Sequence, residues 1–168
     1  VLEYLHNENA RTAEALAPVA DLEKSLYWEM RARIKEDDDS VPVLQKGFYY
    51  YTRYQAGQEY PLHCRKQGSL EAREEVILDE NQEARGQSYF DVGSAETSPD
   101  QKLLAFTVDT RGRRIYELRF KDLRTGKTLP DRLTQVTPSF VWAADNKTIF
   151  FVRQDEETLR SHQLFRYE

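Results

Sequence analysis

The chain has 168 residues, of which 39% are hydrophobic and 32% are charged, and its net charge is −5. No apolar run approaches the roughly 20 residues that a membrane-spanning helix needs, and the mixed charge argues against nucleic acid, whose binding needs clustered Lys and Arg. The single cysteine, Cys64, has no partner for an internal disulfide, which favours a cytoplasmic protein.

Residues 1–38 are predicted to form an N-terminal helical extension. A first helix ends near Pro18, and Asp21 is placed as the N-cap of a second helix because its carboxylate can accept from free N–H groups. Apolar residues at steps of four in the second helix predict one face packed on a larger body. These residues are Leu22, Leu26, Met30 and Ile34.

Residues 39–168 change from helical to strand-like periodicity and contain a repeat. The stretch from Ser98 to Phe106 predicts a tight turn that leads into a buried strand. The stretch from Ala144 to Phe151 has the same pattern about 45 residues later, a period typical of propeller blades. A fainter copy surrounds Gly47.

Three units can be superposed on this repeat, with approximate limits 41–86, 87–135 and an incomplete 136–168. Their paired strands are expected at 47–51 and 60–65, at 102–106 and 116–121, and at 147–151 and 162–166. Leu62, Leu118 and Leu164 fall in register. Residues 74–79 are expected as an outer strand, and residues 89–92 and 139–142 as innermost strands.

The predicted fold class is mainly β, a partial β-propeller preceded by a helical segment. Blades of this kind are apolar on both faces and must stack on neighbours. Another β architecture remains an alternative.

No catalytic or metal site can be assembled from the sequence, so no catalytic, cofactor-binding or metal-binding residue is predicted. Ser94 lacks the second glycine of the Gly-x-Ser-x-Gly motif and precedes a turn instead of a helix. His63 and Cys64 are adjacent in a strand and therefore point to opposite faces, and Cys64 is expected in the core. His6 and His162 occur singly. The acidic pairs are expected on solvated surfaces, at Asp37-Asp38, Glu74-Glu75 and Glu156-Glu157.

Several motifs occur in a specific order and spacing along the whole chain. They are Leu26-Tyr27-Trp28-Glu29-Met30, Arg33-Ile34-Lys35-Glu36-Asp37-Asp38, Ser40-Val41-Pro42, Gly47-Phe48-Tyr49-Tyr50-Tyr51-Thr52-Arg53, Leu78-Asp79-Glu80-Asn81, Ser98-Pro99-Asp100, Asp122-Leu123-Arg124-Thr125-Gly126 and Pro138-Ser139-Phe140-Val141-Trp142. Together they resemble oligopeptidase B (bacterial protease II), a group within the prolyl oligopeptidase family of serine peptidases.

This resemblance implies the end of an N-terminal extension and roughly the first two to three blades of a seven-bladed propeller. In such enzymes the propeller covers an α/β-hydrolase domain that carries the catalytic Ser, Asp and His, and this domain would lie beyond residue 168. The resemblance also implies cleavage of short peptides after Arg or Lys by the parent enzyme. The segment itself is expected to be inactive and to help exclude folded proteins from the active site.

Two other functions remain open. The chain can be read as a stand-alone propeller-type module that binds a peptide or protein, or as part of a prolyl oligopeptidase or dipeptidyl peptidase relative with another substrate. Because an incomplete ring exposes blade faces and strand edges, the segment is also expected to self-associate. Both ends of the chain suggest a piece of a longer protein, since it begins at Val1 without Met and ends at Glu168 within a strand-like segment.

Overall fold

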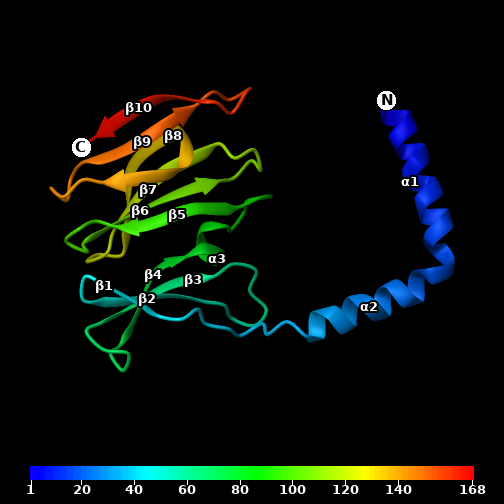
Figure 1. The fold of residues 1–168 in the computed structure, drawn as a ribbon, viewed down its shortest axis with the longest axis horizontal. Helices are drawn as coiled ribbons and strands as arrows, with labels where there is room; N and C mark the ends of the chain where they lie inside the picture. The colour runs from blue at the N-terminus through cyan, green and yellow to red at the C-terminus, as the bar shows by residue number, and fades with distance from the viewer. The chain divides into compact units, whose positions relative to one another are not determined.

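The structure is a computed structural model that describes residues 1–168, and it divides into two compact units, Val1–Asp37 and Asp38–Glu168 (Figure 1). The first unit is helical. It consists of α1 (Leu2–Leu16), a 3-10 helix η1 (Ala17–Val19) that contains Pro18, and α2 (Ala20–Ala32). No helix in the structure combines the length and the apolar character that crossing a membrane requires.

The predicted N-cap of α2 is wrong. Val19 occupies the cap position and makes no side-chain hydrogen bond, whereas Asp21 lies inside the first turn. The η1 turn explains the shift, because it leads the chain into α2 without the extended residue that a side-chain cap requires. Asp21 can still interact favourably with the helix dipole there. The predicted apolar stripe of Leu22, Leu26, Met30 and Ile34 is exposed, so its packing on a larger body stays a prediction.

The second unit contains ten strands and one short helix, which confirms a mainly β fold. The strands are β1 (Val43–Gln45), β2 (Phe48–Arg53), β3 (Leu62–Gln67), β4 (Glu74–Asp79), β5 (Asp91–Thr97), β6 (Leu103–Asp109), β7 (Tyr116–Asp122), β8 (Lys127–Trp142), β9 (Ile149–Gln154) and β10 (Ser161–Tyr167). The helix is α3 (Glu80–Glu83).

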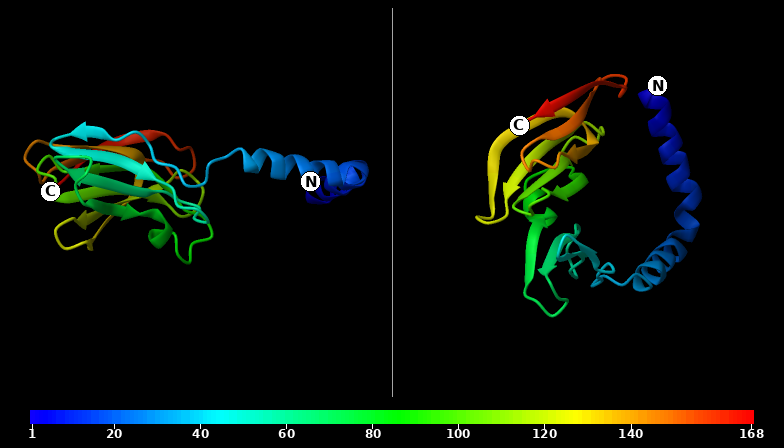
Figure 2. Two further views of the ribbon diagram at one scale, coloured as in Figure 1. Left: turned by 90° about the horizontal axis from the view of Figure 1, so that it is seen from below. Right: turned by 60° about the vertical axis from the view of Figure 1, so that its left-hand side comes forward.

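These strands form two antiparallel sheets, a four-stranded sheet ordered β1-β2-β3-β4 and a six-stranded sheet ordered β10-β9-β8-β7-β6-β5 (Figure 2). The four-stranded sheet has the number of strands that one propeller blade has. Its end is joined to the preceding segment, because Ser40 N–H donates to Thr52 O at 2.9 Å and Thr52 N–H donates to Ser40 Oγ at 2.8 Å.

The long strand β8 explains why the other sheet has six strands. Its first part pairs with β7, from Asp122 opposite Lys127 to Tyr116 opposite Val136. Its last part pairs with β9, from Val136 opposite Arg153 to Trp142 opposite Ile149. The strand therefore ends one antiparallel group and begins the next. The blade limits 41–86, 87–135 and 136–168 remain a prediction.

The repeated turns share one local structure. After β5, Ser98 N–H donates to Leu103 O, Leu103 N–H donates to Ser98 Oγ, and Ser98 Oγ–H donates to Asp100. After β8, Ala143 N–H donates to Thr148 O in the same way. Gln101 and Asn146 both take the left-handed conformation, with φ of 65° and 66°. The fainter copy differs, because Lys46 and Gly47 both have positive φ in a two-residue hairpin loop, the pattern of a type I′ turn.

The second unit contains three hydrophobic clusters, of which the two larger ones both include residues of β6. One cluster spans both sheets and contains Ile77, Leu78, Phe90, Leu104, Phe106 and Val108. The other lies within the six-stranded sheet and contains Ala105, Tyr116, Leu118, Phe120, Val136, Phe140, Ile149 and Phe151. Because β6 contributes alternate residues to both clusters, it is apolar on both faces, as expected for a blade strand.

Two details of the strand predictions differ from the structure. The innermost strand expected at 89–92 begins at Asp91 and extends to Thr97, because it continues past Gly93 with a bulge between Val92 and Ser94. Leu62 and Leu118 are buried as their common register predicts, but Leu164 is exposed. Leu164 lies on β10, an edge strand with no further strand beside it.

Candidate functional site

The residues with nucleophilic or metal-binding chemistry do not form a reactive group. Ser94 lies within β5, where its N–H donates to Thr107 Oγ1 at 3.0 Å. Cys64 is buried in β3, and burial raises the pKa of its thiol to about 11. His6 lies in α1 and His162 in β10. The structure contains no group of three or more His, Cys, Asp or Glu residues that is suited to a metal ion.

His63 has a specific partner that the sequence did not reveal. Its Nε2 lies 2.6 Å from Glu80 Oε1, at the start of α3, and the Glu80 carboxylate is buried. Asn81 beside it forms two hydrogen bonds with the main chain of Tyr60, which fixes the helix against the loop before β3. This pair has no adjacent nucleophile, so we assign it a structural role.

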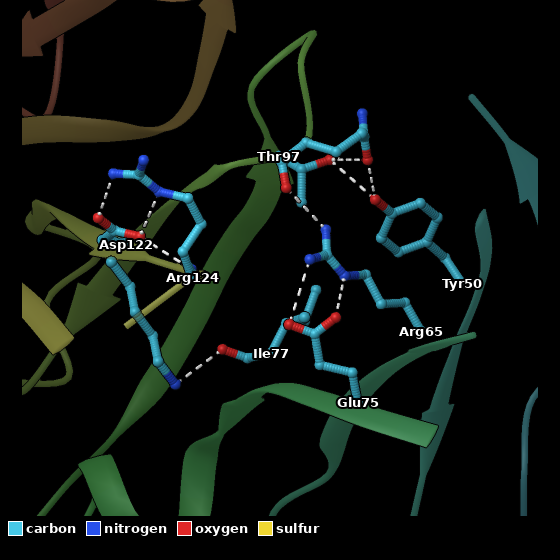
Figure 3. Close-up of polar contacts among 9 residues, drawn as sticks. Tyr50, Arg65, Glu75, Ile77, Thr97, Asp122 and Arg124 are labelled. Atoms are coloured by element: carbon cyan, nitrogen blue, oxygen red, sulfur yellow. Dashed lines mark hydrogen bonds and ion pairs between the residues drawn. The ribbon is translucent and has the colours of Figure 1, made fainter. Parts of the chain in front are cut away.

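The main polar site of the second unit lies where the two sheets meet, and Arg65 is at its centre (Figure 3). The Arg65 side chain, only 6% exposed, binds both carboxylate oxygens of Glu75, with N–O distances of 2.8 and 3.2 Å. Its Nη1 donates to Gln101 O on the other sheet at 3.0 Å. The guanidinium also lies 4.4 Å from the centre of the Phe48 ring. Burial acts to lower the pKa of the Arg65 guanidinium, but the interactions with Glu75 and Tyr50 together outweigh it and raise that pKa.

Tyr50 makes the second polar connection between the sheets. Its hydroxyl lies 3.2 Å from Thr97 Oγ1 and donates to Gln101 Oε1, and Thr97 donates to the same oxygen at 3.0 Å. The Gln101 amide in turn donates to Ser98 O at 3.1 Å. The repeated turn at 98–101 therefore receives the side chains of Tyr50 and Arg65 from the preceding sheet.

Two further contacts cross from the six-stranded sheet to the four-stranded sheet and α3. Lys121 Nζ donates to Ile77 O at 2.9 Å, as Figure 3 shows for the labelled Ile77. Arg119 Nη1 lies 3.3 Å from Glu83 Oε2 on α3. The nearby pair of Asp122 and Arg124 stays within one turn and is exposed on the Arg124 side. We call the contacts of Arg65, Tyr50, Lys121 and Arg119 the inter-sheet clasp.

A groove with a volume of about 500 Å³ opens beside the clasp. The four-stranded sheet and the segment before it contribute Val41, Val43, Lys46 and Tyr50 to its walls. The six-stranded sheet contributes residues of β5, including Glu96, and the end of β8, with Val141 and Trp142. The Trp142 Nε1–H donates to Glu96 O at 3.2 Å, which holds the indole against β5.

The acidic pair Glu74-Glu75 corrects one expectation. Both residues belong to β4 and bind arginines, since Glu74 pairs with Arg53 at 2.7 Å and Glu75 with Arg65. The Tyr51 hydroxyl also donates to Glu74, and burial together with this bond raises the pKa of Tyr51. The reason is the register, which sets Arg65 directly opposite Glu75. Opposite charges that face each other on neighbouring strands could identify paired acidic residues of this kind, but the sequence shows them only when the strand register is already known.

The chain matches the family described as prolyl oligopeptidase, N-terminal beta-propeller domain, over residues 1–167. It is 43% identical to dipeptidyl aminopeptidase BI of Pseudoxanthomonas mexicana, over 98% of this chain and 25% of that protein. It is 32% identical to Protease 2 of Moraxella lacunata, over 99% of this chain and 25% of that protein.

Solved structures give the same result. Oligopeptidase B from Leishmania major is 34% identical, with a TM-score of 0.89, over 99% of this chain and 24% of that chain. Oligopeptidase B from Trypanosoma brucei, in a closed form with covalently bound antipain, is 30% identical with a TM-score of 0.85, over the same shares. The chain thus spans about a quarter of the length of these relatives.

Proposed function

Since this chain belongs to the family of prolyl oligopeptidase N-terminal β-propeller domains, we propose that it is the non-catalytic propeller segment of a serine oligopeptidase. The observation that carries the proposal is the match over nearly the whole chain to relatives about four times as long. In the longer protein an α/β-hydrolase domain supplies the serine, with histidine as its base in the usual triad. The propeller segment acts as a filter that admits short peptides and excludes folded proteins.

The proposed substrates are short peptides cleaved after Arg or Lys. The likeness to Protease 2 and to two oligopeptidase B structures supports peptide cleavage, and the preference for Arg or Lys rests on the resemblance of the sequence motifs to oligopeptidase B. A cytoplasmic location belongs to the same proposal, supported by the single, buried Cys64. None of the residues of this chain is assigned to the chemistry of the cleaved bond.

The experiment compares this chain with the longer protein that carries it. A peptide that ends in Arg-p-nitroanilide should be hydrolysed by the longer protein and not by the 168-residue chain. To test the filter, a short Arg-containing peptide and the same sequence within a stably folded protein are offered together, and only the free peptide should be cleaved. Specific turnover by the 168-residue chain, or equal cleavage of the two substrates, would contradict the proposal.

A second candidate activity is the release of dipeptides from a free N-terminus, because the relative named dipeptidyl aminopeptidase BI is 43% identical. Matched substrates with free and acetylated N-termini separate the two activities. An aminopeptidase loses activity on the acetylated substrate, whereas an endopeptidase that cleaves after Arg or Lys retains it. The stand-alone binding module is tested by the gene itself, since a stop codon directly after Glu168 favours it and a downstream Gly-x-Ser-x-Gly argues against it.

A further inference from the structure

The groove beside the inter-sheet clasp has the physical character of a ligand site. Its volume of about 500 Å³ lies within the range of roughly 300 to 1,000 Å³ typical of small-molecule and cofactor sites. Three of its lining residues, Val41, Val43 and Val141, are 84%, 63% and 64% exposed. These apolar side chains line the groove together with polar ones, so the groove offers a ligand both kinds of contact.

The strands beside the groove favour an extended polypeptide as the ligand. β1 and β5 are the terminal strands of their sheets, so each has one edge that pairs with no other strand. Residues of both strands line the groove. Free strand edges bind extended peptides through main-chain hydrogen bonds, with side chains placed in adjoining pockets.

The charged side chains of the groove determine which peptide fits. Glu96 lies on the wall formed by the six-stranded sheet, and Lys46 lies on the wall formed by the four-stranded sheet. Both are exposed, and neither side chain makes an ion pair or a hydrogen bond. His63, which also lines the groove, is bound to Glu80, and Asp100 next to Pro99 is bound to Lys102 at 3.0 Å. One acidic and one basic group thus remain available on opposite walls.

We propose that this groove binds a short peptide with free termini, the ammonium group at Glu96 and the carboxylate at Lys46. The apolar wall of Val41, Val43 and Val141 receives the side chains. The relevance of this site to the cell rests on the proposed peptidase function, which supplies short peptides as substrates and products.

The test uses the 168-residue chain and the tripeptide Ala-Val-Ala, whose only charges are its termini. Binding is measured by NMR chemical-shift titration at low salt for the free, N-acetylated and C-amidated forms. We expect each blocked form to bind about 3- to 5-fold more weakly, the size of a partly exposed ion pair. Equal affinity of the three forms, or no binding of the free tripeptide, would overturn the proposal.

Two variants assign the ends of the peptide. In Glu96→Gln, the free and acetylated tripeptides should bind equally while the amidated form stays weaker, and in Lys46→Met the reverse should hold. Glu157→Gln and Lys147→Met, exposed residues outside the groove, serve as matched controls and should retain the behaviour of the unmodified chain. If the acetylated and the amidated tripeptides still bind more weakly than the free tripeptide to both variants, the placement of the ammonium group at Glu96 and of the carboxylate at Lys46 is refuted. No hydrolysis is measured, so failure here is distinguishable from failure of the peptidase assignment.

Discussion

Arg65 is the residue on which the contact between the sheets depends most. Its buried guanidinium makes three hydrogen bonds, two to Glu75 and one to Gln101 O. Substitution Arg65→Met keeps most of the apolar stem but leaves the Gln101 carbonyl and the Glu75 carboxylate without this partner. Removing one member of a buried charged pair is strongly destabilising, but Glu75 is 42% exposed and water can replace part of the loss.

We therefore expect Arg65→Met to lower the free energy of unfolding by about 2 kcal/mol, measured by urea denaturation. Arg124→Met is the matched control. The Arg124 side chain is 69% exposed and pairs with Asp122 within one turn, so its loss should leave the stability nearly unchanged. Equal effects of the two substitutions would show that the inter-sheet clasp does not stabilise the chain.

The Asp145 carboxylate predicts how the stability of the fold depends on pH. Hydrogen bonds from the Thr148 hydroxyl and from the Thr148 and Lys147 N–H groups lower the pKa of Asp145 to about 2. An unfolded chain has an aspartate pKa of about 3.9. Because the folded value is the lower one, the ionised carboxylate stabilises the fold above about pH 4, and this contribution is lost as pH falls toward 2.

Asp145→Asn should accordingly reduce stability at pH 7, and the difference from the unmodified chain should shrink between pH 4 and pH 2. Urea unfolding at several pH values measures the loss of stability at pH 7 and the change of the difference with pH. A difference that stays constant down to pH 3 would contradict this account of the turn.

At the scale of single elements, β5 packs closely against the far part of β8. A Cβ built at Gly93 would lie 2.5 Å from Pro138 Cβ and 2.8 Å from Tyr116 Cε1. Gly93→Ala must therefore displace Pro138 or the Tyr116 ring, and we expect a loss of about 2 kcal/mol from overpacking. Thermal or urea unfolding measures it.

Ser94→Ala is the control in the same strand, because the hydrogen bond of Ser94 to Thr107 uses its main-chain N–H. Its stability should change by about 0.5 kcal/mol or less. In the longer protein it should also leave peptide hydrolysis unchanged, since Ser94 is not proposed as a nucleophile. A large loss of stability or of peptide hydrolysis in Ser94→Ala would contradict this account, because it would show that the Ser94 hydroxyl itself is needed.

The elements with strong local signals were predictable from the sequence, and those that depend on pairing were not. The turn at Ser98 contains residues that bond their own main chain, so its position and the strand after it were correct. The continuous β8 was not anticipated. Its two parts appear in the sequence as an outer strand and an inner strand, and nothing local shows that pairing with β7 and β9 joins them.

Dependence on strand pairing also explains why the inter-sheet clasp could not be predicted from the sequence. The register that places Arg65 opposite Glu75, and the stacking that brings Tyr50 to Gln101, are properties of two sheets and leave no periodic signal. The η1 turn before α2 likewise moved the helix start away from Asp21, although Asp21 is a good capping residue.

At the scale of the whole molecule, the outer sheet face of β8–β10 predicts self-association. Val141, Phe150 and Leu164 are exposed, and the strand pairing places all three on one face. β10 also has an unpaired edge. Exposed apolar faces and free strand edges both promote association between copies.

The sedimentation coefficient of the 168-residue chain should therefore rise with protein concentration. The double substitution Val141→Lys with Leu164→Lys should reduce that rise. Lys147→Met with Glu157→Gln, outside this face, should leave it unchanged. A clean monomer at high concentration would disprove the prediction.

The sixteen residues of β8 have a consequence for how the chain unfolds. Two antiparallel groups share this one strand, so neither can lose it without disrupting the other. We expect β5–β10 to melt and to exchange its amide hydrogens as a single cooperative unit. β1–β4 shares no strand with it and is held to it by the inter-sheet clasp and one hydrophobic cluster, so we expect it to open by itself at lower free energy. During synthesis, the group that contains β5–β7 stays incomplete until β8 has been made.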